Sequence, residues 1–421
     1  MTTHDSDAPS RLARRLGTSD AVVIGLGSMI GAGVFAAIGP AAEAAGSGLL
    51  VGLAIAAAVA FCNATSSAQL AALSPQSGGT YVYGRERLGS FWGYLAGWGF
   101  VVGKTASCAA MALTVGAYAW PEWCRPIAVG AVVALTAVNY HGISKTVRLT
   151  RAIVAVVLAA LAAVVVGSLA GGQAATTNLG SLTVEGWSGI LESAGLLFFA
   201  FAGYARIATL GEEVTAPART IPRAIPIALG ITLVVYAIVA VSALVAVGPV
   251  ALADSTAPLA TALRVGSLDW LAPAVRVGGT LAALGVLLSL IAGVSRTAFA
   301  MATNGDLPRV LDAVHPTHHV PYRAELAVGA ALTALVLVAD LRGAIGFSSF
   351  AVLTYYAITN IAAWTLPTAE RRRWTRQLAL LGVAGCALLA FALPTASVVT
   401  GAAVLALGAV IWLVRAATNS S

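Results

Sequence analysis

The sequence predicts an all-α integral membrane protein with about twelve transmembrane helices. Of its 421 residues, 59% are hydrophobic, only 10% are charged and 44 are glycine. Apolar stretches near the ~20 residues that a helix needs to cross a bilayer recur along the chain. The basic residues gather between these stretches and leave their interiors almost uncharged. This combination is typical of multi-pass membrane proteins and not of soluble domains.

The predicted spans follow one another with short polar or glycine-containing connections. In chain order they cover residues 19–45, 48–73, 91–118, 125–141, 150–171, 187–211, 224–248, 276–302, 324–340, 343–365, 377–393 and 395–415. The polar segment 1–18 has no apolar core, so we expect a cytosolic tail and not a signal peptide. Residues 416–421 are expected to form a cytosolic C-terminal tail.

The distribution of lysine and arginine predicts the orientation of these spans. With the N-terminus inside, seventeen basic residues fall on the inner side and four on the outer side, while Lys104, Arg206 and Arg296 lie within spans. Because cytoplasmic loops carry the excess of Lys and Arg, both termini are predicted to be cytoplasmic. We therefore expect a multi-pass protein of the cell membrane. The net charge of +7 follows from these loops, so no nucleic-acid partner is expected.

The first span contains a run that is unusual for a helix, GLGSMIGAGVF at residues 25–35. Each glycine costs a helix about 1 kcal/mol relative to alanine, and in hydrocarbon an unwound helix survives only where other groups bond its backbone. Amides freed at Gly31, Ala32 and Gly33 would face an anion at the positive end of a half-helix. The alternative, small residues for tight helix packing, stays open because Gly27 and Gly31 also fit that pattern.

The sixth span has a similar interruption, because Gly203 and Arg206 stand beside bulky aromatic residues well inside it. Spans one and six cross the membrane in opposite directions. Two interrupted helices in this relationship are typical of inverted-repeat transporters. We therefore expect a first five-helix repeat at 19–171, a second, inverted repeat at 187–365, and two further helices at 377–415.

Four motifs occur in one order along the first 310 residues: 25–35, then GGTYVY at 78–83, then 212–225, and then 295–308 with its NGDLP. In this, the chain resembles permeases of the amino acid–polyamine–organocation superfamily, and most closely the bacterial cationic amino acid transporter-like members. The resemblance implies the LeuT-like fold, a five-plus-five inverted repeat with helices one and six broken, plus two C-terminal helices.

The resemblance also implies how a zwitterionic amino acid would bind. Its carboxylate would meet the amides of the first-span break, and its ammonium would meet backbone carbonyls of both breaks. The residues expected to bind substrate are Met29, Gly31, Ala32, Gly33, Phe199, Ala202 and Gly203. Phe201 and Tyr204 are expected to gate the site, with simple packing of the bundle as the alternative.

Lys104 is the candidate coupling residue, since an ionisable group within a span costs roughly 3 kcal/mol and marks function by default. In proton-coupled relatives a lysine lies in span five, but the matching position here is Val157 or Leu158. We hypothesise that Lys104 supplies the missing cation and that a proton is the coupling ion. A structural lysine is the alternative. Sodium is the less favoured ion, with Ser295 as a possible hydroxyl ligand.

Three further charged residues are candidates for an inner gate: Arg206, Glu212 and Glu213. Arg206 follows Gly203 by three positions, and two helical turns separate it from Glu213, a distance that a third group can bridge. A solvated, charge-paired helix end is the alternative for the two glutamates.

No pattern points to an enzyme, because the sequence shows no nucleophile motif and no nucleotide-binding loop. The four cysteines have no disulfide or metal-ligand spacing, so no metal or cofactor is expected, nor is an obligate protein partner. The sequence thus predicts a permease that moves small neutral or apolar L-amino acids by alternating access, with proton symport. An amino acid exchanger and a polyamine or amine permease are the alternatives.

Overall fold

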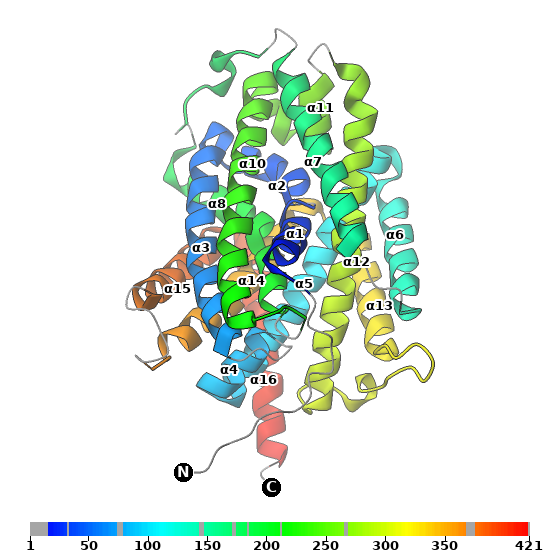
Figure 1. Cartoon of the computed structure of the whole chain (residues 1–421), viewed down its shortest axis with the longest axis vertical. Coiled ribbons are helices and arrows are strands. Elements are labelled where there is room, and N and C mark those ends of the chain that lie inside the picture. The colour runs from blue at the N-terminus through cyan, green and yellow to red at the C-terminus, as the bar shows by residue number, and fades with distance from the viewer. Residues whose placement is uncertain are drawn as a thin grey trace.

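The structure is a computed structural model of the chain. It describes residues 16–31, 33–73, 79–142, 147–170, 174–182, 185–210, 213–264, 268–367 and 375–419. These residues form helices joined by short turns, and an isolated bridge pairs Leu16 with Val214. Figure 1 shows the helices assembled into one elongated bundle.

The α-helices have the following bounds: α1 (Thr18–Met29), α2 (Gly33–Ala45), α3 (Leu49–Leu73), α4 (Thr80–Leu88), α5 (Ser90–Ala119), α6 (Cys124–Tyr140), α7 (Val147–Leu169), α8 (Gly186–Phe201), α9 (Ala205–Ala208), α10 (Pro217–Ala253), α11 (Pro258–Arg264), α12 (Ala272–Thr303), α13 (Tyr322–Val338), α14 (Leu341–Trp364), α15 (Thr375–Ala392) and α16 (Thr395–Asn419). Short 3-10 helices connect several of them, among them η1 (Gly46–Gly48) and η4 (Ala202–Tyr204).

Ten of the described helical runs are long and apolar enough to cross a membrane. One of them, Gly33–Leu73, contains α2, η1 and α3 together, and α13 falls outside the ten with its 17 residues. The multi-pass, all-helical architecture agrees with the sequence. The count of twelve spans, the inverted repeat and the boundaries of the repeats stay predictions.

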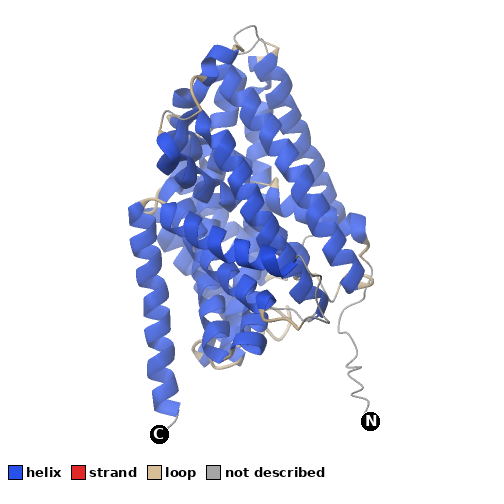
Figure 2. Ribbon diagram, turned by 90° about the vertical axis from the view of Figure 1, so that its left-hand side faces the viewer, coloured by secondary structure: helices blue, strands red, loops and turns tan. Residues whose placement is uncertain are grey.

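Burial separates the central helices from those at the periphery. In the most apolar 18-residue stretch of α5, and in that of α14, 78% is buried inside the bundle. The corresponding stretch of α16 is only 17% buried. Figure 2 shows α16, the helix that ends at the C-terminus, along one side of the bundle. Its outward positions are apolar, as lipid contact requires.

Candidate substrate-binding site

The first predicted span is interrupted where the glycines predicted it. α1 ends at Met29, and the Ile30 N–H donates to the Leu26 carbonyl at 2.8 Å as the last bond of that helix. Gly31 lies in a turn, and α2 begins at Gly33. Ala32 lies outside the described residues. The span thus consists of two helices, α1 and α2, which are separated at the predicted anion site.

The sixth span departs from α-geometry in a milder way than a full break. α8 ends at Phe201, one 3-10 turn covers Ala202–Tyr204, and α9 continues from Ala205. Where the sequence predicted an unwound stretch, the structure has a single 3-10 turn, which is wound more tightly than an α-helix. Short 3-10 stretches within a helix often mark hinges at functional sites.

The two interruptions lie against each other. A Cβ at Gly203 would be 2.5 Å from the Ser28 carbonyl carbon and 2.8 Å from the Met29 nitrogen. A Cβ at Gly33 would be 2.5 Å from the Ala200 Cα, and one at Gly31 would overlap the Val286 side chain. These glycines therefore permit close helix contact, as the packing interpretation expects, and the same contact brings backbone groups of both interruptions together.

Two tyrosines that the sequence analysis missed bond the carbonyls of these interruptions. The Tyr236 hydroxyl on α10 lies 2.5 Å from the Met29 oxygen and 3.1 Å from the Ala200 oxygen. The Tyr356 hydroxyl on α14 donates to the Ala202 oxygen at 3.3 Å. A hydroxyl has one proton to donate, so Tyr236 serves two acceptors with a single donor. A ligand ammonium, with three donors, matches this surplus of acceptors.

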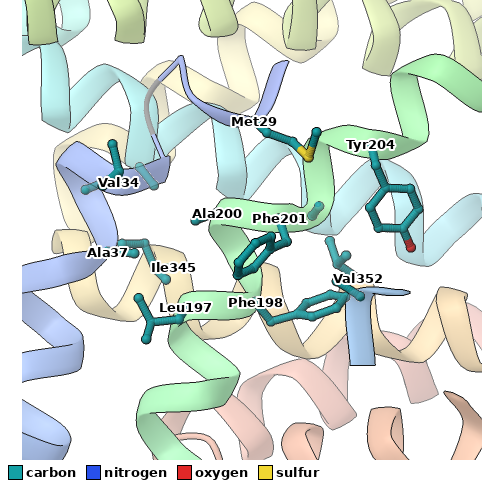
Figure 3. Packing of buried hydrophobic residues seen from close by; sticks show 14 of the residues in the cluster. Met29, Val34, Ala37, Leu197, Phe198, Ala200, Phe201, Tyr204, Ile345 and Val352 are labelled. Carbon is teal, nitrogen blue, oxygen red and sulfur yellow. The ribbon is translucent and has the colours of Figure 1, made fainter. Parts of the chain in front are cut away.

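The aromatic residues of the sixth span are packed within the bundle. Phe201 and Tyr204 are fully buried. Phe201 contacts Tyr236 with ring centroids 5.3 Å apart, and Tyr204 stacks on Tyr356 at 5.2 Å. Figure 3 shows Phe201 among other buried side chains between the first and sixth spans. Both residues fill space in this conformation, so a gating role requires these rings to move.

Next to the interruptions lies a small apolar cavity of about 10 Å³, enough for about one water molecule. Its wall is entirely apolar, and Tyr236 contributes to it through apolar atoms. The lining residues are Val34, Ile38, Leu49, Leu53, Leu197, Ala200, Tyr236 and Ala240. An amino acid is larger than this cavity, so binding requires helices or side chains to move apart. The side chains that would then surround it favour an apolar substrate.

Lys104 is buried in α5, with 6% of the residue exposed. Within the described ranges, its ammonium has no hydrogen bond or ion pair. The adjacent Gly103 packs closely on Ala351 of α14, and the Ser107 and Ser348 hydroxyls are 2.6 Å apart. Lys104 therefore lies at the tight α5–α14 contact, and these contacts do not join it to the two interruptions.

The predicted inner-gate residues are only partly assembled. The exposed Arg206 donates to the Thr209 hydroxyl at 3.2 Å and interacts electrostatically with Glu213 and Arg296. Arg206 and Glu213 form no ion pair in the part of the chain that the structure describes. Glu212 lies outside the described residues.

The backbone beside Glu213 has a role that the sequence did not indicate. The Leu16 N–H donates to the Glu213 carbonyl at 3.1 Å, and the Thr215 N–H donates to the Leu16 carbonyl at 2.9 Å. These two hydrogen bonds join the segment before α1 to the segment before α10, and so link the start of the first span to the end of the sixth.

An ion-pair cluster connects three helices at the other end of the bundle. Arg342 on α14 pairs with Glu43 on α2 and with Glu192 on α8, the latter at 2.7 Å. Glu192 is 25% exposed in its side chain, so the pair with Arg342 lies partly in contact with solvent. The three residues are far apart in the sequence, and local pattern holds no signal for their contact.

Glu325 is a further residue that the sequence analysis missed. It belongs to the first turn of α13, only 3% of it is exposed, and its Oε2 atom has no partner among the described residues. Ser295 and Arg296 of α12 are the polar groups that act on it. Its place beside Tyr322 and Arg323 resembles a solvated helix start, which is why the sequence did not single it out.

Comparison with known proteins identifies the family. A model of the amino acid permease family matches residues 16–417. The chain belongs to this family. This match confirms the resemblance drawn from the four motifs and supports a transporter with a small-molecule substrate, not an enzyme.

Several relatives align over most of this permease. An uncharacterized transporter of Mycobacterium tuberculosis is 64% identical over 410 residues, which cover 97% of this chain and 93% of the relative. The branched-chain amino acid permease BcaP of Bacillus subtilis is 29% identical, covering 74% and 72%. Human cationic amino acid transporter 4 is also 29% identical, covering 84% of this chain and 59% of the human protein.

Proposed function

We propose that this permease is a secondary active transporter of small neutral or apolar L-amino acids that works by alternating access. The observation that carries the proposal is the contact between the two interruptions, where Met29 and Ala200 present carbonyls to one shared hydroxyl. Family membership and the name of the branched-chain relative support the substrate class.

In the proposed binding mode, each end of the amino acid meets a different interruption. The carboxylate binds the amides of Gly31, Ala32 and Gly33 at the start of α2, where the helix dipole favours an anion. The ammonium binds the carbonyls of Met29, Phe199 and Ala202 and the neighbouring turn at Gly203. The Tyr236 hydroxyl then gives up one of its two acceptors to the ligand.

The substrate side chain occupies the enlarged apolar cavity. Leu53, Leu197 and Val34 line this cavity, and none of its lining residues is a carboxylate that would bind a cationic side chain. Apolar side chains are therefore preferred over those of lysine or arginine.

Proton coupling through Lys104 is part of the proposal. A buried lysine loses its proton more readily than an exposed one, and Lys104 has no described counter-charge. Phe201, Tyr204, Arg206, Glu212 and Glu213 act as gates in this scheme, and both termini lie in the cytoplasm. No cofactor takes part.

The testing experiment measures uptake of radiolabelled leucine and alanine into proteoliposomes, with and without an inward proton gradient. Uptake that rises with the gradient supports symport. Uptake that ignores the gradient but requires internal amino acid indicates an exchanger. Competition by putrescine and not by alanine would contradict the proposal and favour an amine permease.

A further inference from the structure

A second cavity, of about 370 Å³, lies at the end of the bundle where α4, α5, α12 and α16 meet. In Figure 1, α16 passes α4 and continues to the C-terminus at the base of the molecule. The lining residues are Arg85, Tyr94, Asn304, Gly305, Asp306, Arg309, Trp412, Arg415 and Ala416. The cavity shares no lining residue with the substrate site. Its volume lies in the range of small-molecule sites.

The cavity carries an excess of positive charge. Its three arginines face a single carboxylate, Asp306, and that carboxylate already has partners. Its Oδ2 atom accepts from Arg85 at 2.8 Å and from the Tyr81 hydroxyl at 2.6 Å. Burial, followed by this hydrogen bond, raises the pKa of Tyr81 to about 12, so Tyr81 remains a donor at neutral pH.

The other two arginines retain donors for a ligand. Arg415 donates from Nη1 to the backbone carbonyl of Asp306 at 2.7 Å, which leaves most of its five N–H groups and its charge unused. The exposed Arg309 side chain makes no ion pair or hydrogen bond within the described residues. A ligand with anionic oxygens satisfies both guanidinium groups.

The Tyr94 hydroxyl is an independent sign of a missing partner. Tyr94 is 1% exposed and lines the cavity, and its hydroxyl has no hydrogen-bond partner among the described residues. A buried hydroxyl left unsatisfied costs about 1–3 kcal/mol. An acceptor oxygen of a bound ligand removes this cost.

The position of the cavity indicates what kind of anion it holds. Beside it, α16 presents apolar side chains outward, among them Leu413 and Val414, which are 57% and 58% exposed. Trp412 contacts Phe91 with ring centroids 5.1 Å apart, an aromatic pair of the kind that collects at membrane interfaces. An acyl chain along this face of α16 would bring its headgroup to the arginines.

We propose that this cavity binds the phosphate of an anionic phospholipid. Arg309, Arg415 and the Tyr94 hydroxyl contact the phosphate oxygens, while the acyl chains follow the apolar face of α16. Cytoplasmic leaflets hold the anionic lipids that basic residues attract, and the arginine excess places this end of the bundle there. The lipid would hold α16 against α12.

The test follows thermal unfolding of the purified full-length protein in neutral detergent. Phosphatidylglycerol is titrated in, and phosphatidylcholine with the same acyl chains serves as the neutral lipid. We expect phosphatidylglycerol alone to raise the unfolding temperature. Arg309→Gln and Arg415→Gln should each weaken its apparent affinity about five-fold, the effect of one basic residue near an anionic surface.

Two further variants separate binding from folding. Tyr94→Phe removes no hydrogen bond to any residue that the structure describes, so it should weaken the lipid effect without lowering the lipid-free unfolding temperature. Arg219→Gln is the matched control, because Arg219 is exposed and does not line the cavity. It should leave the affinity unchanged.

Three outcomes would overturn the proposal. The first is equal stabilisation by both lipids, and the second is unchanged phosphatidylglycerol affinity in the Arg309→Gln, Arg415→Gln double variant. The third is an equal shift with glycerol 3-phosphate or inorganic phosphate, which would show a site for a free anion. None of these results depends on amino acid transport.

Discussion

Gly203 has the tightest backbone contact of the two interruptions. Replacing it with alanine places a methyl group against the Ser28 carbonyl group, where backbone and not a flexible side chain must move. We expect Gly203→Ala to cost about 1–3 kcal/mol of stability, as overpacking does, and to abolish leucine uptake. Thermal unfolding and proteoliposome uptake measure the two effects.

The matched control for this substitution is Gly230→Ala. Gly230 lies in α10, and a Cβ there meets no atom within 4 Å. Alanine should be neutral or slightly stabilising at this position, because it favours the helix. Equal losses in both variants would show that the contact at Gly203 has no special role.

A substitution at Tyr236 tests the proposed ammonium site, where two backbone carbonyls share one hydroxyl donor. Tyr236→Phe leaves the Met29 and Ala200 carbonyls without their shared donor, so the ligand-free protein should lose about 1–3 kcal/mol. A bound amino acid then supplies the missing donor, so leucine should raise the unfolding temperature by more in this variant than in the unaltered protein.

Tyr83→Phe is the control for Tyr236→Phe. Tyr83 is also buried, but its hydroxyl has no partner among the described residues, so its removal should not destabilise the protein. If leucine stabilises Tyr236→Phe and the unaltered protein equally, Tyr236 is not linked to substrate binding.

The proposed coupling of uptake to protons depends on one residue, Lys104. Lys104→Ala should abolish the response of uptake to an inward proton gradient and leave a folded protein, since the residue has no described bond to lose. Uptake measured at matched internal and external pH provides the baseline. Coupling that persists in Lys104→Ala would assign the lysine a structural role and make exchange the better model.

At the scale of elements, the Arg342 cluster joins α2, α8 and α14 across one end of the bundle. Arg342→Ala should change overall stability by less than about 1 kcal/mol, because partly exposed ion pairs contribute little. It should nevertheless favour opening at this end, since these three helices include parts of both interrupted spans.

Opening can be measured at Leu197, which lines the apolar cavity and is buried. In a cysteine-free background, Leu197→Cys should react with a polar maleimide several-fold faster when Arg342→Ala is also present. Arg342→Lys, which keeps the charge, serves as the control. An unchanged labelling rate would mean that the cluster does not hold the bundle closed.

The elements also show what the sequence could predict. The interruption after Met29 was predictable, because glycine weakens a helix through local backbone properties. The milder turn at Ala202 was predicted as a full break, since sequence cannot weigh local strain against the packing of Phe201 and Tyr204. Tyr236 and Arg342 were missed because their partners lie in other spans, and no local pattern encodes such contacts.

At the scale of the whole molecule, the number of crossings depends on α13. Its 17 residues span about 25 Å at 1.5 Å each, less than the ~30 Å of a typical bilayer core. Local thinning of the bilayer accommodates such a helix at a modest cost. If α13 crosses, and the run Gly33–Leu73 crosses twice through α2 and α3, the described runs make twelve crossings. This even number places both termini on the same side of the membrane.

Single cysteines at the two ends of α13 test this topology. Thr317→Cys precedes the helix and should react with a membrane-impermeant maleimide only after cells are permeabilised, whereas Ala339→Cys, at its other end, should react in intact cells. Glu122→Cys, in the exposed turn before α6, is the control for the outer side. Labelling of Thr317→Cys and Ala339→Cys under the same condition would mean that α13 does not cross. Reactivity of Thr317→Cys alone in intact cells would reverse the predicted orientation, and the arginine-lined cavity would then face the outer leaflet.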